Sequence, residues 1–509
     1  MPLCAAQNDA ISNLPSLGDA GGTDLSVLEE RKLGELIMRD YRAMGEVTED
    51  PEITAYLNEL GGKIVQAAGE SPANFEFFLV AESALNAFAL PGGYIGVHTG
   101  LIAAARTESE LASVLAHEVG HVTQRHIARM YSQSQSTSLV STAALIAAVL
   151  VAGSNPNAAQ GLVAAGAGYQ LEKQLGFSRD AEREADRVGF NTLEKAGFDP
   201  QGMVDFFGRL QQNSRLYENN APTYLRTHPL TTERMADIQN RAGLERKSVS
   251  KTEPVNLNFE LVRVKSLVYA DKTAQQLSSR LKSLKNPTAQ LSVSNPVALA
   301  YGQALVYQKL NQPDKALSAL EQARTLLGSS AAQSGTGNAQ PALLQNLEMV
   351  LRIGQRVAKN GGVKEFAPAR QQAELNESDA RFLAVLQAYR KNNPDSMPAR
   401  LNHVQGLQAM GLYAMAEAVL NDLTVVYRSN PLLFDLQARN ALAQGKLGEH
   451  HLFVAQAYAA RGAYLPAIEQ TRIARKYAAN NYYLVAEIEA KERVYKQRAD
   501  EEREFAKAN

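Results

Sequence analysis

The chain has 509 residues, which is too long for one compact core, so two or more domains are expected. Its formal net charge is −1, and this balance gives no electrostatic reason to expect nucleic acid as a partner. Aromatic residues make up only 7% of the chain and tryptophan is absent, which favours a mainly helical protein over a β-sandwich.

Residues 1–25 are predicted to be the remnant of an export signal followed by an unstructured stretch. Cys4-Ala5-Ala6 fits the small-x-small pattern of a signal-peptidase site with cleavage after Ala6, although no charged region precedes it. An ordinary unstructured N-terminus is the alternative. Cys4 is the single cysteine of the chain, so no internal disulfide can form, and cleavage would leave a cysteine-free protein suited to an oxidising compartment.

Residues 26–250 are predicted to form an α+β domain that is mainly helical with a small sheet. Two amphipathic helical segments come first, followed by a strand at 75–83 and two strands within 84–102 around a Pro-Gly-Gly turn. Thr107, with Glu110 three residues later, predicts a capping box at the start of the next helix. Further helices follow, with a break at Gly197 and Pro200.

The sequence HEVGH at residues 117–121 lies in the middle of that next helix and indicates a zinc site. His117 and His121 project from the same side of a helix one turn apart, and Glu118 can act as a general base. The chain has only 8 histidines, so a chance match is uncommon, although short patterns of this kind also occur in unrelated proteins.

A hydrolytic zinc site usually takes three protein ligands and keeps a fourth position open. Glu182 lies 61 residues after His121 on a helical segment, and Asp186 shares its face and can accept a hydrogen bond from a ligand imidazole. Glu184 is expected to point away as a solvated charge. A surface charge cluster is the alternative for all three acidic residues.

Three stretches in this order, NAFALPGGYIGVHTGL at 86–101, HEVGH and EREAD at 182–186, resemble the gluzincin family of the HtpX and CAAX-prenyl-protease type. The resemblance covers roughly residues 30–245. It implies that the glutamate that opens the E-x-x-A-D stretch, here Glu182, is the third zinc ligand. HtpX carries transmembrane helices, whereas the longest apolar run here, residues 139–152, is shorter than the roughly 20 residues that a bilayer span needs.

Residues 251–295 are polar and mixed and are interpreted as a linker. Residues 296–509 are predicted to form an all-α solenoid of tetratricopeptide repeats, with small residues such as Ala316, Ala416 and Ala467 where paired helices approach each other. The register is irregular, because these three alanines are separated by 100 and then by 51 positions. A generic helical bundle is the alternative.

The arrangement of a protease domain followed by repeats resembles the BepA-like family of periplasmic proteases of Gram-negative bacteria, and the resemblance extends to THPLTTERMADI at 227–238. It implies that His228 can approach the zinc from a loop as a fourth ligand and hold the enzyme latent until the loop moves. Displaced slightly, the same imidazole could stabilise an oxyanion. Arg234 is a weaker candidate for that role or for holding the loop. A His-Pro turn that caps a helix is the alternative for His228.

Specific roles are predicted for two further segments and one further histidine near the site. The segment Asn86, Ala87, Phe88 and Ala89 is a candidate edge strand on which substrate adds as an extra strand, and an ordinary interior strand is the alternative. The apolar stretch 139–168 is expected to pack under the site as a helical hairpin, or to form a lid that meets a membrane. His126 is expected to be a structural hydrogen-bonding residue.

Together these observations predict an exported zinc-dependent endopeptidase with one Zn²⁺ per chain and a chaperone-like repeat domain. The resemblance implies a periplasmic location, misfolded or stalled outer-membrane proteins as clients, and the barrel-assembly machinery as a partner of the repeats. No transmembrane segment is expected, although peripheral contact with a membrane is compatible with the apolar stretch. The alternative is a chaperone or assembly scaffold whose metal site is plugged or inactive.

Overall fold

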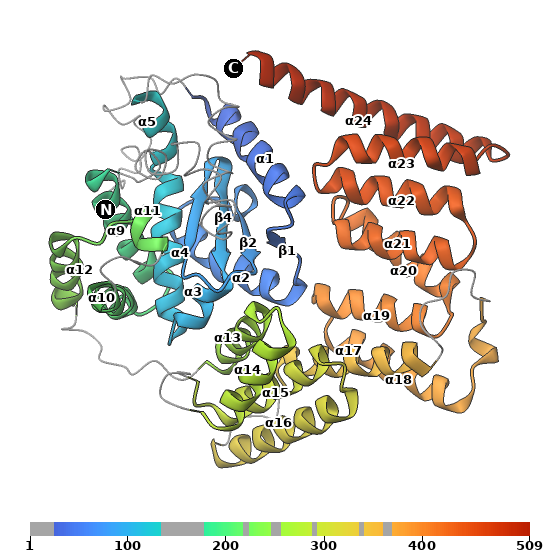
Figure 1. Ribbon diagram of the computed structural model, residues 1–509, viewed down its shortest axis with the longest axis horizontal. Helices are drawn as coiled ribbons and strands as arrows, with labels where there is room; N and C mark the ends of the chain where they lie inside the picture. Colours follow the sequence, from blue (N-terminus) through green and yellow to red (C-terminus); the bar gives the residue numbers. More distant parts are fainter. Residues whose placement is uncertain are drawn as a thin grey trace, which may run out of the picture.

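The computed structural model describes residues 25–133, 178–216, 223–245, 256–287, 293–334, 340–359 and 369–508. The predicted signal remnant and the apolar stretch 139–168 lie outside these ranges. Figure 1 shows two parts of the molecule. The part with the sheet, residues 25–245, contains HEVGH and is called the catalytic region, and the arc consists of the helices between residues 296 and 508. The predicted fold class, a mainly helical α+β domain followed by an all-helical region, is confirmed.

The sheet of the catalytic region has four strands in the order β1-β2-β4-β3. The outer pairs β1–β2 and β3–β4 are antiparallel, and the central pair β2–β4 is parallel. Consecutive glycines at 92 and 93, with φ of 76° and 88°, make the tight connection from β3 to β4, which non-glycine residues rarely adopt. The strands are β1 (Val47–Thr48), β2 (Glu76–Val80), β3 (Ala87–Leu90) and β4 (Tyr94–His98).

Helix α4 (Glu108–Thr123) is the central element of the catalytic region, and its residues from Ser109 to His121 are all buried. The Thr107 side chain caps it by accepting a hydrogen bond from the backbone N–H of Glu110 at 3.2 Å. The other half of the predicted capping box is replaced, because the Glu110 carboxylate accepts from the backbone of Arg106 and pairs with Arg209.

Helix α9 (Arg179–Lys195) packs closely against α4 because each helix offers a glycine at the contact. A side chain on Gly120 would meet the backbone of Ala185 at about 3.1 Å, and one on Gly189 would meet the backbone of Ala116 at about 3.0 Å. The glycine inside HEVGH therefore lets the helix that carries EREAD approach the metal-site helix. The other helices of this region are α1 (Val27–Ala43), α2 (Pro51–Ala67), α3 (Thr99–Ala104), α5 (His126–Gln133), α10 (Gln201–Leu216), α11 (Thr223–Thr227) and α12 (Thr232–Glu245).

The segment interpreted as a linker, residues 251–295, instead contains two packed helices, α13 (Leu257–Ala270) and α14 (Ala274–Lys285). Helix α13 is buried along most of its length, and its charged side chains form ion pairs inside the protein. Lys265 pairs with Asp50 at 2.8 Å and also with Glu52, and Arg263 donates to Glu260 at 3.1 Å. Because these charges are paired, the segment forms part of the core in spite of its polar composition.

Among residues 397–508, the helices start at regular intervals that were not evident from the sequence. The starts of α19 and α21 are 34 residues apart, as are those of α20 and α22, and α23 starts 33 residues after α21. Spacing of this length favours the predicted tetratricopeptide architecture. The irregular register arose because Ala416 lies in the second helix of one pair and Ala467 in the first helix of another. The helices of the arc are α15 (Pro296–Lys309), α16 (Pro313–Ser334), α17 (Ala342–Lys359), α18 (Glu377–Asn392), α19 (Met397–Ala409), α20 (Tyr413–Val426), α21 (Pro431–Ala443), α22 (Leu447–Ala460), α23 (Tyr464–Tyr477) and α24 (Tyr482–Ala508).

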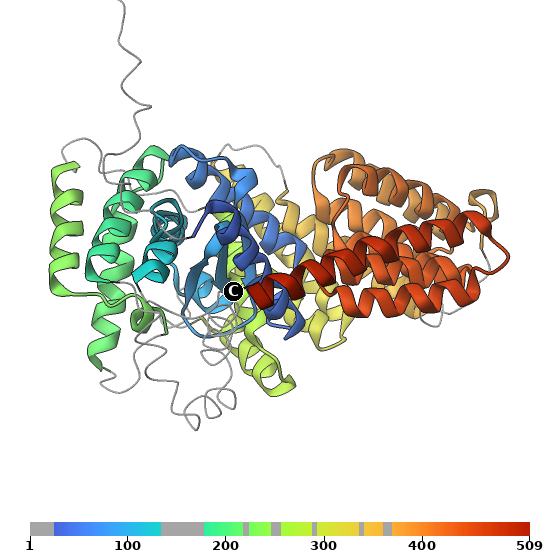
Figure 2. The same cartoon turned by 90° about the horizontal axis from the view of Figure 1, so that it is seen from above.

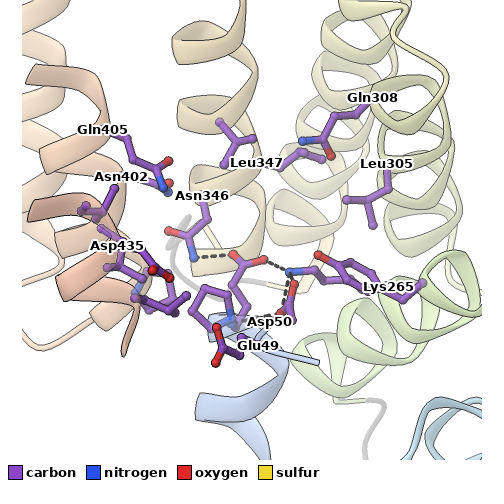
Figure 3. Close-up of a pocket in the computed structure, with 18 of the residues that line it drawn as sticks. Glu49, Asp50, Lys265, Leu305, Gln308, Asn346, Leu347, Asn402, Gln405 and Asp435 are labelled. Atoms are coloured by element: carbon purple, nitrogen blue, oxygen red, sulfur yellow. Dashed lines mark hydrogen bonds and ion pairs between the residues drawn. The ribbon is translucent and has the colours of Figure 1, made fainter. Parts of the chain in front are cut away.

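The arc contacts the catalytic region around the N-terminus of α2. Residues of both parts line a cavity of about 340 Å³ at this contact (Figure 3). Its floor is the ion pair between Asp50 and Lys265, and Asn346 of the arc donates to Glu52 at 2.5 Å. Figures 1 and 2 show that α24 then runs back over the repeats toward α1. Within the described ranges, no helix combines the length and the apolar character needed to cross a membrane.

Candidate metal centre

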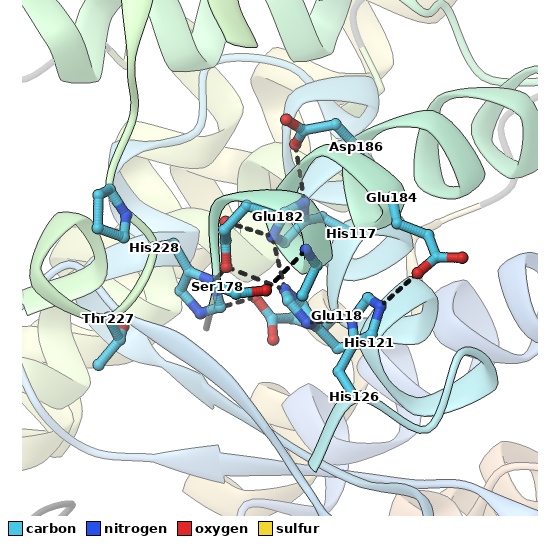
Figure 4. Close-up of polar contacts among 12 residues, drawn as sticks. His117, Glu118, His121, His126, Ser178, Glu182, Glu184, Asp186, Thr227 and His228 are labelled. Atoms are coloured by element: carbon cyan, nitrogen blue, oxygen red, sulfur yellow. Dashed lines mark hydrogen bonds and ion pairs between the residues drawn. The ribbon is translucent and has the colours of Figure 1, made fainter. Parts of the chain in front are cut away.

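Four side chains from three separate segments converge beneath α4. His117 and His121 come from α4, Glu182 from the first turn of α9, and His228 from the turn between α11 and α12. One potential ligand atom from each lies within 4.8 Å of the others, and all four residues are buried. Figure 4 shows these side chains pointing toward one another. The structure thus brings together the four residues proposed as metal ligands.

The distances among the three main ligand atoms suit a tetrahedral cation. The Nε2 atoms of His117 and His121 are 3.0 Å apart, and the Glu182 carboxylate oxygens lie 3.5 Å from the first and 3.4 Å from the second. In a tetrahedral zinc site with bonds of about 2.1 Å, ligand atoms lie about 3.4 Å from one another. Two imidazoles and one carboxylate are also a ligand set that zinc accepts.

The charges around the cluster are those of a cation site. Burial lowers the pKa of His117, but hydrogen bonds and charge from Asp186 and Glu182 outweigh it and raise the pKa to about 9. Burial raises the pKa of Glu182, but the neighbouring histidines outweigh it and hold the pKa well below its ordinary value. These shifts show that the carboxylates around the cluster favour positive charge, which a divalent cation would supply.

Asp186 lies behind His117, as predicted for a residue that orients a ligand imidazole. Its Oδ1 is 3.0 Å from His117 Nδ1, on the side of the ring away from the cluster. Arg234 holds this carboxylate with two hydrogen bonds of 2.6 and 2.8 Å, and its Nη1 is also 2.6 Å from Glu182. Arg234 further donates to the backbone oxygen of Pro229 at 2.8 Å. It therefore holds the loop that follows His228, one of its two predicted roles.

The imidazole of His228 lies between two carboxylates. Its Nδ1 is 3.0 Å from Glu182 Oε1, and its Nε2 is 3.6 Å from Glu118 Oε1. Tyr224, four residues earlier, stacks on the ring with centroids 4.7 Å apart, and its backbone oxygen accepts from the His228 backbone N–H at 2.8 Å. The sequence interpretation missed Tyr224, although its i−4 spacing from His228 on a short helix was a usable signal.

Glu118 is buried beside the cluster and directed at the space next to His228. Neither of its carboxylate oxygens has a well-formed hydrogen bond to the described residues. Burial raises the pKa of Glu118, opposed by the charges of His228 and His117. A buried carboxylate with unsatisfied oxygens is suited to accept a proton from a reacting molecule.

The strand that contains the predicted substrate segment lies at the edge of the sheet. Residues Ala87 to Leu90 of β3 pair with β4 on one side only among the described strands. Helix α4 contacts β3, and the backbone of Ala89 faces the Glu118 carboxylate. Ala87 to Ala89 thus hold the predicted edge position among the described strands, Asn86 comes directly before β3, and the substrate-binding role stays a prediction.

Of two predictions about residues beside the site, one needs correction and one is confirmed. Glu184 does not stand alone in solvent: its Oε2 accepts from Arg129 at 2.6 Å and lies 3.1 Å from His126 Nε2. His126 is buried and its Nδ1 lies 2.8 Å from Nδ1 of His121. The expectation that His126 is a structural hydrogen-bonding residue is therefore confirmed, and one of its partners is a residue of the metal cluster.

A helix-borne HExxH pair, a carboxylate ligand from a second helix and a buried glutamate beside them define a metallopeptidase. The sequence pattern of peptidase family M48 matches residues 51–242. The beta-barrel assembly-enhancing protease of Escherichia coli is 31% identical over 420 residues, which are 81% of this chain and 82% of the relative. The chain therefore belongs to peptidase family M48, a family of metalloendopeptidases, in the group of the beta-barrel assembly-enhancing proteases.

Other relatives differ in how much of the chain they cover. A putative beta-barrel assembly-enhancing protease of Vibrio cholerae is 39% identical over 319 residues, and this match spans 62% of the chain and 64% of the relative. The mitochondrial metalloendopeptidase OMA1 of Schizosaccharomyces pombe is 28% identical over 186 residues, 36% of the chain and 52% of the relative. The similarity to this more distant relative is thus limited to about a third of the chain.

Proposed function

We propose that the protein is an exported zinc-dependent endopeptidase that acts in the quality control and assembly of outer-membrane proteins. The observation that carries the catalytic part is the buried convergence of His117, His121 and Glu182, with distances that suit tetrahedral zinc. The residues that would hold the ion are these three, with His228 as a fourth. When bound, zinc supplies Lewis acidity that polarises a peptide carbonyl and makes water easier to deprotonate.

Glu118 is the proposed general base and acid. Burial raises the pKa of Glu118, so this pKa is closer to neutral pH than that of an exposed glutamate. It takes the proton from the attacking water and returns it to the leaving amine. Among the described residues its oxygens accept no well-formed hydrogen bond, so they can take up and return a proton.

His228 is the proposed gate of this site. Its ring stands between Glu182 and Glu118, in the space that an attacking water and a scissile carbonyl need. Arg234 and Tyr224 hold the segment in place through Pro229 and through ring stacking. A shift of this segment would open the site, and the displaced imidazole would then be placed to stabilise the oxyanion.

The edge of β3 is the proposed substrate-binding strand. An extended polypeptide that pairs with residues 86–89 would run beside Glu118, which the backbone of Ala89 faces. Main-chain hydrogen bonds of this kind recognise extended chains with little dependence on sequence. Such recognition suits clients that are unfolded or stalled in assembly.

The biological setting is inferred from the relatives. The names of the Escherichia coli and Vibrio cholerae relatives assign them to the assembly of β-barrel proteins, and matches to both extend beyond the M48 segment. We assign the same setting to this chain: a periplasmic location, stalled outer-membrane proteins as substrates, and the barrel-assembly machinery as a partner of the helical arc.

The decisive experiment compares hydrolysis of unfolded casein by the zinc-loaded wild type, Glu118→Gln and His228→Ala. Removal of the general base is expected to lower the rate about 10²–10⁴-fold with zinc retained. If His228 acts as a gate, His228→Ala cleaves faster than the wild type. If it acts chiefly on the oxyanion, its loss lowers the rate about 10²–10³-fold.

The second candidate function is an assembly scaffold with a permanently plugged site, and the position of His228 between Glu182 and Glu118 is the observation that favours it. The same experiment separates the two functions. If neither the wild type nor His228→Ala cleaves casein while both hold one zinc per chain, the protease proposal fails and the scaffold remains.

A further inference from the structure

The two metal-site histidines of α4 are supported in different ways. His117 has a carboxylate directly behind it, since its Nδ1 lies 3.0 Å from Asp186. His121 has a second imidazole behind it, and the Nδ1 atoms of His121 and His126 are 2.8 Å apart. The two rings are nearly perpendicular, with centroids 4.8 Å apart and planes at 73°.

The second imidazole is itself held by a charged pair. His126 Nε2 lies 3.1 Å from Oε2 of Glu184, and the same oxygen accepts from Nη2 of Arg129 at 2.6 Å. Figure 4 shows His126 and Glu184 on the side of His121 away from His228. His126 is 2% exposed, whereas Glu184 and Arg129 lie nearer the surface.

A left-handed residue makes this arrangement possible. Helix α4 ends at Thr123, and Arg125, with φ of 53°, turns the chain into α5 so that His126 comes back beside His121. That backbone conformation is uncommon for a residue other than glycine. The Arg125 guanidinium holds the turn by donating to Glu30 at 2.8 Å and to the Leu25 backbone oxygen at 2.7 Å.

The direction of the hydrogen bonds follows from the position of the cluster. Nε2 of His121 faces the other ligand atoms and must present a lone pair to a metal, so the proton of this ring resides on Nδ1. That Nδ1–H donates to Nδ1 of His126. The proton of His126 then resides on Nε2 and is donated to the Glu184 carboxylate.

We propose that His126, held by Glu184 and Arg129, is a positioning residue that fixes the tautomer and the ring orientation of the metal ligand His121. This inference rests on the proposed metal site. Groups that orient a ligand histidine usually change metal affinity about 10–100-fold when they are removed. Metal affinity, rather than proteolysis alone, is therefore the quantity to measure.

The test measures the zinc dissociation constant by competition with a chromogenic chelator and records the absorption spectrum of the cobalt-substituted protein. His126→Ala is expected to bind zinc about 10–100-fold more weakly than the wild type and to alter the cobalt spectrum. In His126→Asn, the side-chain oxygen takes the place of Nδ1 and still accepts from His121, so affinity should return to within a few-fold. Glu184→Ala, at a partly exposed position, should weaken binding less than His126→Ala.

His403→Ala, at a half-buried histidine of α19 in the arc, serves as the matched control and should leave zinc affinity unchanged. The inference is overturned if His126→Ala binds zinc as the wild type does, or if His126→Asn is as weak as His126→Ala. The proposed function is a separate matter: it fails, together with this inference, if the wild type itself binds no zinc.

Discussion

The catalytic region and the helical arc stabilise their interiors in opposite ways. Beneath α4, polar and ionisable side chains from segments more than a hundred residues apart, such as His117 and His228, are buried together. In the arc, small apolar side chains of neighbouring helices, such as Ala455 and Ala467, are buried in one cluster. The first interior depends on the pairing of buried charges, and the second depends on side-chain size. The predictions below test this difference.

The largest effect is expected where a buried charge loses its partner. Arg234→Met removes the cation that pairs with Asp186 and Glu182, and uncompensated buried carboxylates should lower the free energy of unfolding of the catalytic region by about 3–5 kcal/mol. Urea unfolding of the metal-free protein measures this loss. Arg187→Met, on the exposed face of α9 next to Asp186, should change it by less than about 0.5 kcal/mol. Equal losses in the two variants would contradict the comparison.

The next effect concerns a buried histidine outside the metal cluster. Burial lowers the pKa of His98 to about 4, against about 6.5 in an unfolded chain. Between these values only the unfolded state binds the proton, so the free energy of unfolding should fall by about 3 kcal/mol as the pH drops from 6.5 to 4. His98→Gln should flatten that part of the stability profile, measured by urea unfolding at several pH values with metal removed. Parallel profiles for the two proteins would show that His98 does not contribute.

The smallest effect is expected from a change of size in the arc. Ala467 is fully buried against α22 and α24, so Ala467→Leu should over-pack the contact and destabilise these helices by about 1–3 kcal/mol. Hydrogen exchange should rise in α22 to α24, while zinc binding by the catalytic region stays unchanged. Ala490→Leu, at an exposed site on α24, is the matched control. An equal rise in exchange in the control would mean that burial at position 467 is not the cause.

Local patterns were sufficient to predict much of the fold and the metal cluster. HEVGH and EREAD are short helical patterns in which the spacing of residues determines the face of the helix on which each side chain lies. The structure brings His117, His121 and Glu182 together. Helical spacing could not reveal that His126 contacts His121, because the left-handed residue Arg125 turns the chain after α4 ends. Nothing in the local sequence identifies an arginine as a residue that will adopt this conformation.

The missed helices have a different cause. Helix α13 was interpreted as part of a linker because Lys265 and Arg263 made it appear solvated, whereas their partners are supplied by tertiary contacts and by Glu260. Polar side chains are buried in the arc as well, where Gln437 and Asn440 of α21 lie in the interior. Burial of polar side chains depends on partners from elsewhere in the fold, which a pattern along one segment does not reveal.

The return of α24 to the catalytic region makes the arc a structure tethered at both ends. It leaves through α13 and comes back where Arg39 of α1 meets Glu502 at 2.5 Å and Arg461 meets Glu49 at 2.7 Å. Each exposed pair contributes only about 0.2–1 kcal/mol, but closure of a second contact within one chain occurs at a high effective concentration. A partner that changes the curvature of the arc must therefore also strain or break the contacts of α24 with α1. The curvature of the repeats is in this way coupled to the position of α1.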